Sequence, residues 1–187
     1  MTFWIVRAEK HGSNEKSAIE KNLITIGWNE LPDLSKIGSK DELKTIYDKK
    51  YGPKSKMHIV NVAGQIWNFA TKIVIGDLVA LPLKILSGIA IGEVTSDYQF
   101  KEIEPSIKHI REVKWLKTFP RSAFDQDILN SLGAFLTVGK VRADDAEARV
   151  RSMLSGKVSS IKDEEIDVES SELDLEQYSK DHIIKLL

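Results

Sequence analysis

Residues 57–82 read MHIVNVAGQIWNFATKIVIGDLVALP, a stretch in which a helical pattern gives way to a strand pattern. Val60, Ala63, Trp67 and Ala70 recur at helical spacing, so residues 57–73 are predicted to form a helix. Residues 76–82 are rich in Val, Leu and Ala and predict a strand, and residues 88–98 predict its hairpin partner. This alternation of helix and strand decides the fold class.

The same alternation continues on both sides of this segment. Further strands are predicted over residues 3–8, 23–28, 112–117 and 134–138, and further helices over residues 13–21, 41–50 and 144–154. A short helix is also expected after Ser122–Asp125, which matches a capping box, with Gly133 ending it. Five or six short strands interleaved with helices in about 155 residues predict a small α+β barrel.

Charge divides the chain of 187 residues into a body and a tail. Residues 1–155 hold 23 Lys and Arg against 19 Asp and Glu, whereas residues 156–187 hold 4 against 9. We therefore expect one domain over 1–155, an acidic, serine-rich linker over 156–172 and an amphipathic helix over 173–187. The mildly basic body is compatible with a polyanionic partner, and the apolar face of the tail helix could pair two copies as a homodimer.

Composition also narrows the class of protein. The chain has no apolar run of the roughly 18 residues that a membrane helix needs, and it has no signal peptide and no cysteine. We therefore expect a cytoplasmic protein without a membrane partner. The phosphate-binding and nucleophile-elbow motifs are missing and the four His are scattered, so we expect no cofactor, no metal and no catalytic residue.

One pattern in the sequence leaves nuclease activity as a lesser alternative. Glu112 and Lys114 form an ExK sequence, and Asp97 lies upstream, which are the residue types that a metal-dependent nuclease uses. The alternation of charged and apolar residues along a strand explains the same sequence without any chemistry. We expect no cleavage from these three residues.

The tryptophans and one helix face are the candidates for a binding site. Trp28 follows Gly27 at a predicted strand end, where a part-exposed ring could stack on a base, whereas Trp4 could be either core or pocket wall. Trp67 and Trp115 lie on apolar stripes and are predicted to be core.

Three amides, Asn61, Gln65 and Asn68, share one face of the helix over residues 57–73. Amides both donate and accept hydrogen bonds, as the reading of a base edge requires, although a solvated helix face is the alternative.

The order of these motifs resembles a known class of domain. Trp28, Gln65-x-x-Asn68-Phe69, Gly76-Asp77 and then IAIGEV at residues 89–94 resemble the EVE domains of the PUA-like superfamily. The blocks AGQIW at 63–67, AIGEV at 90–94, PRSAF at 120–124 and SLGAF at 131–135 are similar to the N-terminal domain of Mrr-type, modification-dependent (type IV) restriction endonucleases. The resemblance covers about residues 2–154.

The resemblance implies a PUA-like, EVE-type barrel that binds duplex DNA and flips a modified base into an aromatic and amide pocket. Trp28 would be the stacking wall and Gln65 and Asn68 the pocket rim, while Asn61 joins them by periodicity and Trp4 as a second wall. One departure is that about thirty residues separate Trp28 from the amide helix, where the EVE pattern has only a few.

The resemblance also implies the surroundings of that pocket. Arg121, Lys54, Lys56 and Lys84 are candidate phosphate contacts, with ordinary surface charge as the alternative for each. Residues 173–187 look like the helix that leads into an Mrr nuclease domain, so this part of the chain would target that enzyme without being one. A PUA-like reader of modified RNA is the main alternative.

Overall fold

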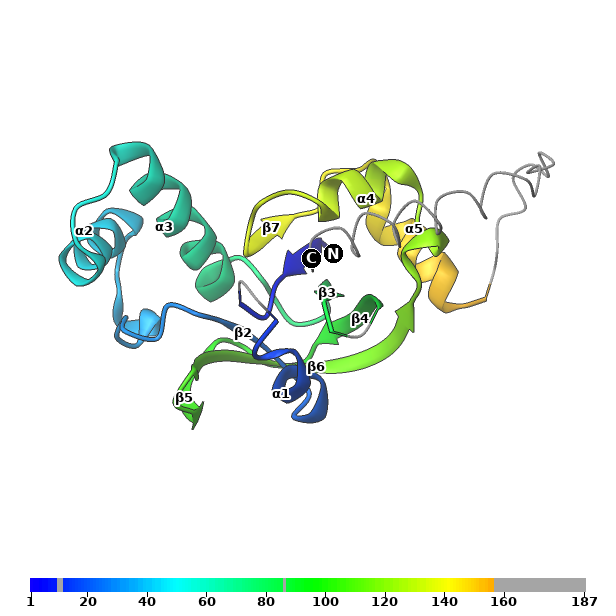
Figure 1. Ribbon diagram of the computed structural model, residues 1–187, viewed down its shortest axis with the longest axis horizontal. Coiled ribbons are helices and arrows are strands. Elements are labelled where there is room, and N and C mark those ends of the chain that lie inside the picture. Colours follow the sequence, from blue (N-terminus) through cyan, green and yellow to red (C-terminus); the bar gives the residue numbers. More distant parts are fainter. Residues whose placement is uncertain (10–11, 86, 157–187) are drawn as a thin grey trace, which may run out of the picture. The chain divides into compact units, whose positions relative to one another are not determined.

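The computed structural model describes residues 1–9, 12–85 and 87–156 (Figure 1). Its elements, in chain order, are β1 (Phe3–Val6), α1 (Glu15–Glu20), β2 (Leu23–Ile26), η1 (Leu34–Lys36), α2 (Lys40–Tyr51), α3 (Lys56–Thr71), β3 (Leu78–Leu83), β4 (Gly88–Val94), β5 (Gln99–Glu104), β6 (Ile107–Phe119), η2 (Arg121–Ala123), α4 (Gln126–Leu132), β7 (Val138–Lys140) and α5 (Ala146–Leu154). The predicted tail helix over residues 173–187, and all but the first residue of the predicted linker over 156–172, lie outside the described residues.

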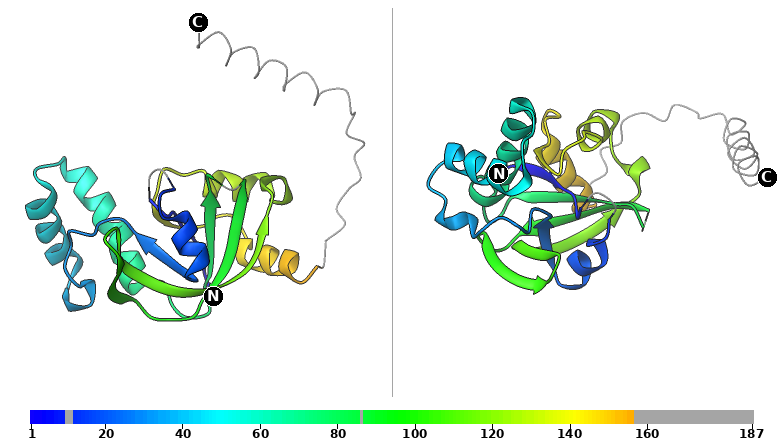
Figure 2. Two further views of the ribbon diagram at one scale, coloured as in Figure 1. Left: turned by 60° about the horizontal axis from the view of Figure 1, so that its bottom comes forward. Right: turned by 60° about the vertical axis from the view of Figure 1, so that its left-hand side comes forward.

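Seven strands form one sheet in the order β2-β6-β4-β3-β1-β7, with β5 pairing to β6. The neighbours run antiparallel except β1 and β3, which are parallel. The sheet curls into a half barrel with helices around it (Figure 2). The predicted α+β class is thus confirmed, whereas the assignment to the PUA-like type stays a prediction.

Strand β6 joins the two parts of the sheet. Its first residues pair with β2 and β5, and its later residues, from Val113 on, pair with β4. The register shifts between Ile91 and Gly92, which marks a β-bulge. A Cβ atom at Gly92 would lie only 2.8 Å from Cε3 of Trp115, so only glycine lets the Trp115 ring lie against the bulge.

The core lies on both faces of the sheet, and β1 shows the division clearly. Trp4 and Val6 pack toward α2 and α3, whereas Phe3 and Ile5 pack toward α4 and α5. Figure 1 shows these two pairs of helices at separate sides of the sheet. Helix α1 covers a third cluster through Ala18.

Helix α3 is rotated relative to its predicted apolar stripe. Val62, Ala63, Ile66 and Phe69 are its buried residues, while the predicted stripe residue Val60 is 39% exposed. Arg111 on β6 holds the C-terminal end of α3, because its buried guanidinium donates to the carbonyl oxygens of Phe69 and Ala70 at 2.8 and 3.0 Å. Trp67 and Trp115, the two tryptophans predicted to lie in the core, are only half-buried and pack against the core.

Two boundaries near the C-terminal part of the domain differ from the prediction. Asp125, rather than Ser122, is the N-cap residue of α4, and Ser122 lies in η2. Strand β7 spans Val138–Lys140 instead of residues 134–138, because residues 133–136 form a loop in which the carbonyls of Ala134 and Leu136 bind an arginine, described below.

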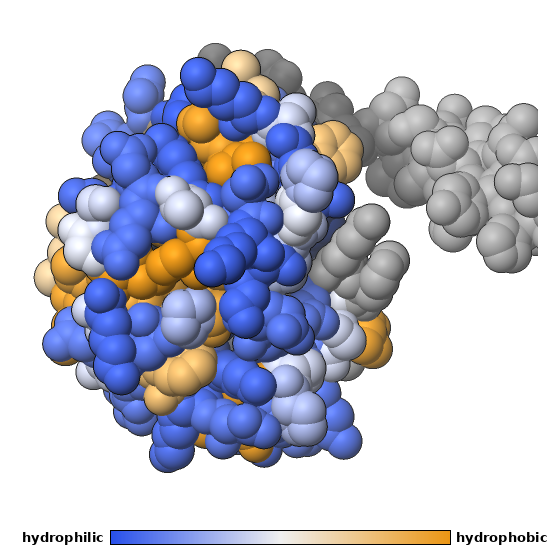
Figure 3. Space-filling view, turned by 90° about the vertical axis from the view of Figure 1, so that its left-hand side faces the viewer, coloured by the Kyte–Doolittle hydropathy of each residue, from blue (hydrophilic) through white to orange (hydrophobic). Residues whose placement is uncertain are grey.

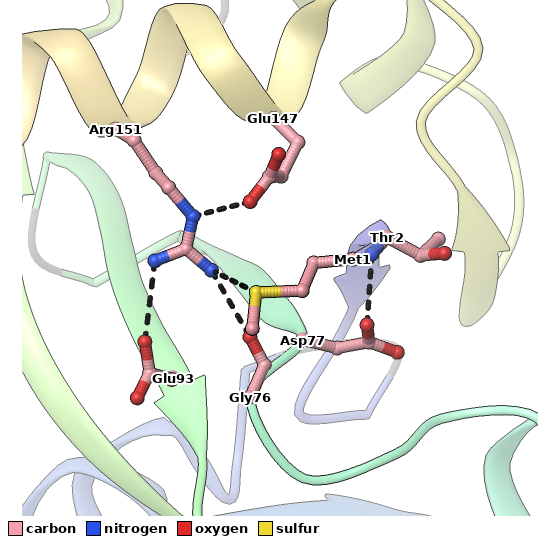
Figure 4. A network of polar contacts seen from close by, with 7 residues as sticks. All are labelled: Met1, Thr2, Gly76, Asp77, Glu93, Glu147 and Arg151. Carbon is pink, nitrogen blue, oxygen red and sulfur yellow. Dashed lines mark hydrogen bonds and ion pairs between the residues drawn. The ribbon is translucent and has the colours of Figure 1, made fainter.

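Asp77, in the Gly76-Asp77 motif, is a structural acceptor. Its buried carboxylate accepts hydrogen bonds from the backbone N–H of Thr2, the indole N–H of Trp4 and the backbone N–H of Val74, at 2.8, 2.9 and 3.1 Å. Figure 4 shows Asp77 beside the contacts of Arg151, which joins α5 to Glu93 on β4 and to the carbonyl oxygen of Gly76. The start of β1, the entry to β3 and α5 are thereby tied together.

The face around α2 and α3 is covered mainly by hydrophilic residues, with apolar surface visible in patches between them (Figure 3). Met57 and Val60 on α3 are among the exposed apolar side chains. None of the helices in the described ranges is long and apolar enough to cross a membrane.

We predict that Gly92→Ala destabilises the domain by about 1–3 kcal/mol, because the new methyl group would collide with the Trp115 ring. That ring cannot move aside without loss, since its N–H donates to the carbonyl oxygen of Ala18 at 3.0 Å. Gly64→Ala in α3 is the matched control. Its Cβ would meet only the end of the Lys40 side chain, at 3.3 Å, and it should stabilise the helix by about 0.5–1 kcal/mol. Urea unfolding measures the free energy of unfolding of both variants. An equal change in the two would contradict the role assigned to Gly92.

Candidate functional site at the end of strand β2

An open cavity of about 770 Å³ lies where β2 ends. It is lined by Arg7, Glu9, Ser13, Gly27, Trp28, Lys84, Gly133, Phe135, Leu136 and Thr137. These residues come from the ends of β1 and β2, the start of α1, the β3–β4 turn and the loop before β7. The volume falls within the range of about 300–1,000 Å³ that is typical of small-ligand sites.

A chain of buried hydrogen bonds fixes the backbone of Trp28. His109 Nε2 lies 3.2 Å from the carbonyl oxygen of Trp28, which can only accept, so Nε2 is the donor. Nδ1 of the neutral ring then accepts from the hydroxyl of Tyr98, at 2.7 Å, and this hydroxyl accepts from the backbone N–H of Leu34. Burial lowers the pKa of His109 to about 4 and raises the pKa of Tyr98 to about 12, so both side chains are neutral at pH 7.

The side chain of Trp28 is fixed as well. It hydrogen-bonds to the Tyr47 hydroxyl, whose pKa is raised by burial and partly lowered again by this bond. The same hydroxyl lies 3.2 Å from Nε2 of His58. Trp28 is half-buried against the core while lining the cavity, so its ring is held in one place with part of its surface accessible.

Arg7 shapes the opposite wall. Its Nε donates to the carbonyl oxygen of Leu136 at 3.0 Å, and its Nη2 donates to those of Leu132 and Ala134 at 2.7 and 3.1 Å. Three carbonyl oxygens within the five residues 132–136 are thus bound to one guanidinium at the end of β1. Phe135 lies between two of the bound carbonyls and is fully exposed.

Gln65 supports the same wall from behind. Its Oε1 accepts from the backbone N–H groups of Thr137 and Val138, at 2.7 and 3.1 Å, and its Nε2 donates to Asn61 at 2.8 Å. Gln65 does not line the cavity but binds the residue that does, Thr137. The amide predicted to contact a base therefore positions the cavity wall.

The other predicted base-binding residues lie away from the cavity lining. Asn61 is exposed and bonds to Gln65, and Asn68 is half-buried with a side chain that makes no hydrogen bond in the described part of the chain. Trp4 is only 6% exposed, within the core, with its N–H bound to Asp77. Of the two positions predicted for Trp4, core or pocket wall, the structure shows the core position.

Positive charge gathers on one side of the cavity. Arg7 and Lys84 line it, and burial together with the nearby charge of Arg121 lowers the pKa of Arg7. Arg121 is therefore close enough to Arg7 to repel it electrostatically. Lys54 and Lys56, the other predicted phosphate contacts, lie at the connection between α2 and α3 and do not line the cavity.

The nuclease alternative has a different location. Glu112 and Lys114 are exposed on β6 and line a second cavity of about 510 Å³, whereas Asp97 does not line it. Within residues 1–9, 12–85 and 87–156, no three His, Asp or Glu side chains are grouped so that they could hold a metal ion. Catalysis by these residues stays untested.

Arg7, Glu9, Ser13 and Phe135 were not predicted as site residues. Arg7 and Glu9 follow directly after the buried strand β1, and a charged residue at a strand end is the one local signal that could have indicated them. The sequence pattern of Ala134–Val138 predicts a strand, and Phe135 was therefore predicted to be a strand residue. Only the fold brings these residues, more than a hundred positions apart, into one cavity.

Residues 4–136 match the family model described as "Domain of unknown function (DUF8426)". The chain belongs to this family. Its description names no activity and no relation to EVE or Mrr-type proteins, so that resemblance stays a prediction. No curated protein matches the chain.

Two solved structures are similar to it at low identity. One is the YTH domain of the Zygosaccharomyces rouxii MRB1 protein in complex with N6-methyladenosine RNA, with 10% identity, a TM-score of 0.42 and 90% of each chain covered. The other is a hypothetical protein from Leishmania major, with 11% identity, a TM-score of 0.41, and 84% of this chain and 96% of that chain covered.

We predict that Gln65→Ala destabilises the domain by about 1–3 kcal/mol, because two backbone N–H groups of the cavity wall lose their acceptor. Asn68→Ala, which removes a comparable amide from the same helix, should change the stability by less than about 0.5 kcal/mol. Amide hydrogen exchange at Thr137 and Val138, measured together with urea unfolding, should accelerate only in Gln65→Ala. Unchanged exchange at both amides would contradict the supporting role of Gln65.

The buried His109 should make stability depend on pH. Its pKa is about 4 in the folded protein and 6.5 when unperturbed, so between these values the unfolded chain binds a proton that the folded domain does not. The contribution of neutral His109 to the free energy of unfolding is complete above pH 6.5. It is lost as the pH falls toward about 4, and the loss amounts to about 3 kcal/mol at most. Urea unfolding at several pH values in this window gives the free energy of unfolding as a function of pH. This free energy should depend less steeply on pH in His109→Gln than in the unaltered chain, and the same dependence in both would refute the assignment.

Proposed function

We propose that this domain is a reader of modified nucleic acid that takes one modified base, extruded from duplex DNA, into the cavity at the end of β2. Stacking would supply most of the binding free energy. The observation that carries the proposal is that two aromatic side chains, the fixed Trp28 and the fully exposed Phe135, line the same open cavity. Stacking on an aromatic ring contributes about 1–3 kcal/mol per base, which can offset the few kcal/mol lost on extrusion.

The charges at the cavity support the same proposal. An extruded nucleotide brings its flanking phosphates to the cavity mouth, and Arg7, Lys84 and Arg121 supply positive charge there. Arg7 uses Nε and Nη2 for the loop carbonyls, so its Nη1 stays outside these bonds. The net charge of the chain is only −1, so affinity should depend on this local cluster more than on long-range attraction.

DNA, rather than RNA, is proposed on the resemblance to Mrr-type restriction proteins. In that arrangement the domain would recognise the base and a downstream nuclease domain in the same chain would cut. The domain itself would have no catalytic residue.

Binding to matched oligonucleotides tests the proposal. Fluorescence anisotropy at one fixed salt concentration compares duplex DNA carrying 5-methylcytosine, 5-hydroxymethylcytosine or N6-methyladenine with the unmodified duplex, and with single-stranded RNA carrying N6-methyladenosine. We expect one modified duplex to bind more tightly than the unmodified one. Equal binding to all duplexes would overturn the proposal, and preference for the RNA would replace it with the RNA-reading alternative.

We predict that Phe135→Ala weakens binding to the preferred duplex by about 1–3 kcal/mol while leaving stability unchanged, because this ring packs against little of the domain. Met57→Ala removes another exposed apolar side chain, one that does not line the cavity, and should not change the affinity. The same anisotropy assay measures both variants. Equal losses in the two would contradict a stacking role for Phe135.

A further inference from the structure

Glu9 brings a carboxylate into the cavity on a backbone that disfavours it. Its φ angle is 67°, in the left-handed region where most non-glycine residues are strained by about 1 kcal/mol. The side chain nevertheless lines the cavity, beside Gly27 and Trp28. Backbone strain of this kind at a cavity suggests that the position of the side chain matters more than local stability.

The two carboxylate oxygens of Glu9 have different surroundings. Oε2 accepts a hydrogen bond from the Ser13 hydroxyl at 2.6 Å, which holds the group in place. Oε1 lies 3.0 Å from the point where a Cβ atom of residue 27 would be, so the absence of a side chain at Gly27 makes room for it. Among the described residues no group donates to Oε1, and it is therefore an acceptor available to a ligand.

This acceptor lies in the same cavity as the Trp28 ring. Gly27 directly precedes Trp28, whose backbone and indole are both fixed. A base stacked on Trp28 would present its edge within the same cavity as Oε1. The remaining charged groups of the lining, Arg7 and Lys84, are cations, so Glu9 is the one anionic acceptor among the lining residues described.

We propose, on the basis of the proposed function, that Glu9 selects bases that carry an exocyclic amino group over thymine- and uracil-type bases. An ionised carboxylate only accepts hydrogen bonds, and it matches the amino groups of cytosine and adenine. Thymine and uracil present a carbonyl oxygen at the equivalent position, where the carboxylate repels it. Glu9 thus determines the class of base, while the two aromatic rings bind any base.

A pair of duplexes that differ in this one group tests the proposal. One carries 5-hydroxymethylcytosine and the other 5-hydroxymethyluracil, each opposite an abasic site, so that neither base must break a pair before it is extruded. We expect the unaltered chain to bind the first duplex about tenfold more tightly or better. In Glu9→Gln, whose amide both donates and accepts, this ratio should fall to within about threefold.

Glu104→Gln is the matched control. Glu104 also accepts a hydrogen bond from a serine hydroxyl, that of Ser17 at 2.8 Å, but it does not line the cavity, so its loss of charge should leave the ratio unchanged. Equal binding of both duplexes by the unaltered chain, or an unchanged ratio in Glu9→Gln, would overturn the selective role of Glu9 alone. Failure of the unaltered chain to prefer any modified duplex, those of the anisotropy comparison included, would overturn the reading function and this inference with it.

Discussion

The cavity depends on the bonds that Arg7 makes to residues 132–136. Leu132 is the last residue of α4 and residues 133–136 lie outside the strands, so without Arg7 the carbonyl oxygens of Leu132, Ala134 and Leu136 would each lose one hydrogen bond. One planar guanidinium satisfies all three, because its N–H groups diverge in a fixed geometry that an ammonium group lacks. These bonds hold the segment against the end of β1, and there Gly133, Phe135 and Leu136 form one wall of the cavity.

The walls of the cavity are held by groups that do not line it. His109 and Tyr98 hold the backbone of Trp28, Tyr47 holds its indole, and Gln65 holds the residues that follow Phe135. The first of these networks is neutral and centred on the buried His109, which strengthens its hydrogen bonds. A stacking surface supported in this way loses little conformational entropy when a ligand binds.

Local patterns in the sequence predicted the class of fold because helix and strand periodicities arise from burial on one face. They missed β5, whose residues QFKEIE are largely exposed and charged, and they placed β7 too early because nothing in the sequence shows that Arg7 binds the carbonyls of residues 132–136. Trp28 was predicted to lie at a cleft because it stands between a buried strand and a polar turn, where a ring is part-exposed. In the structure Trp28 lines the cavity. Arg7 and Glu9 act through partners distant in sequence, which no local pattern contains.

The position of β1 in the sheet has a consequence for the order in which the domain can assemble on the ribosome. Strand β1 is made before both of its partners, yet it lies between β3 and β7, and its partner residues reach as far as Lys140. Until β3 emerges, the apolar segment Phe3–Val6 has no edge to join, and its second edge stays unpaired until β7 follows. Such non-local pairing slows folding, and it leaves an apolar strand with an open, aggregation-prone edge until residues 138–140 have been made.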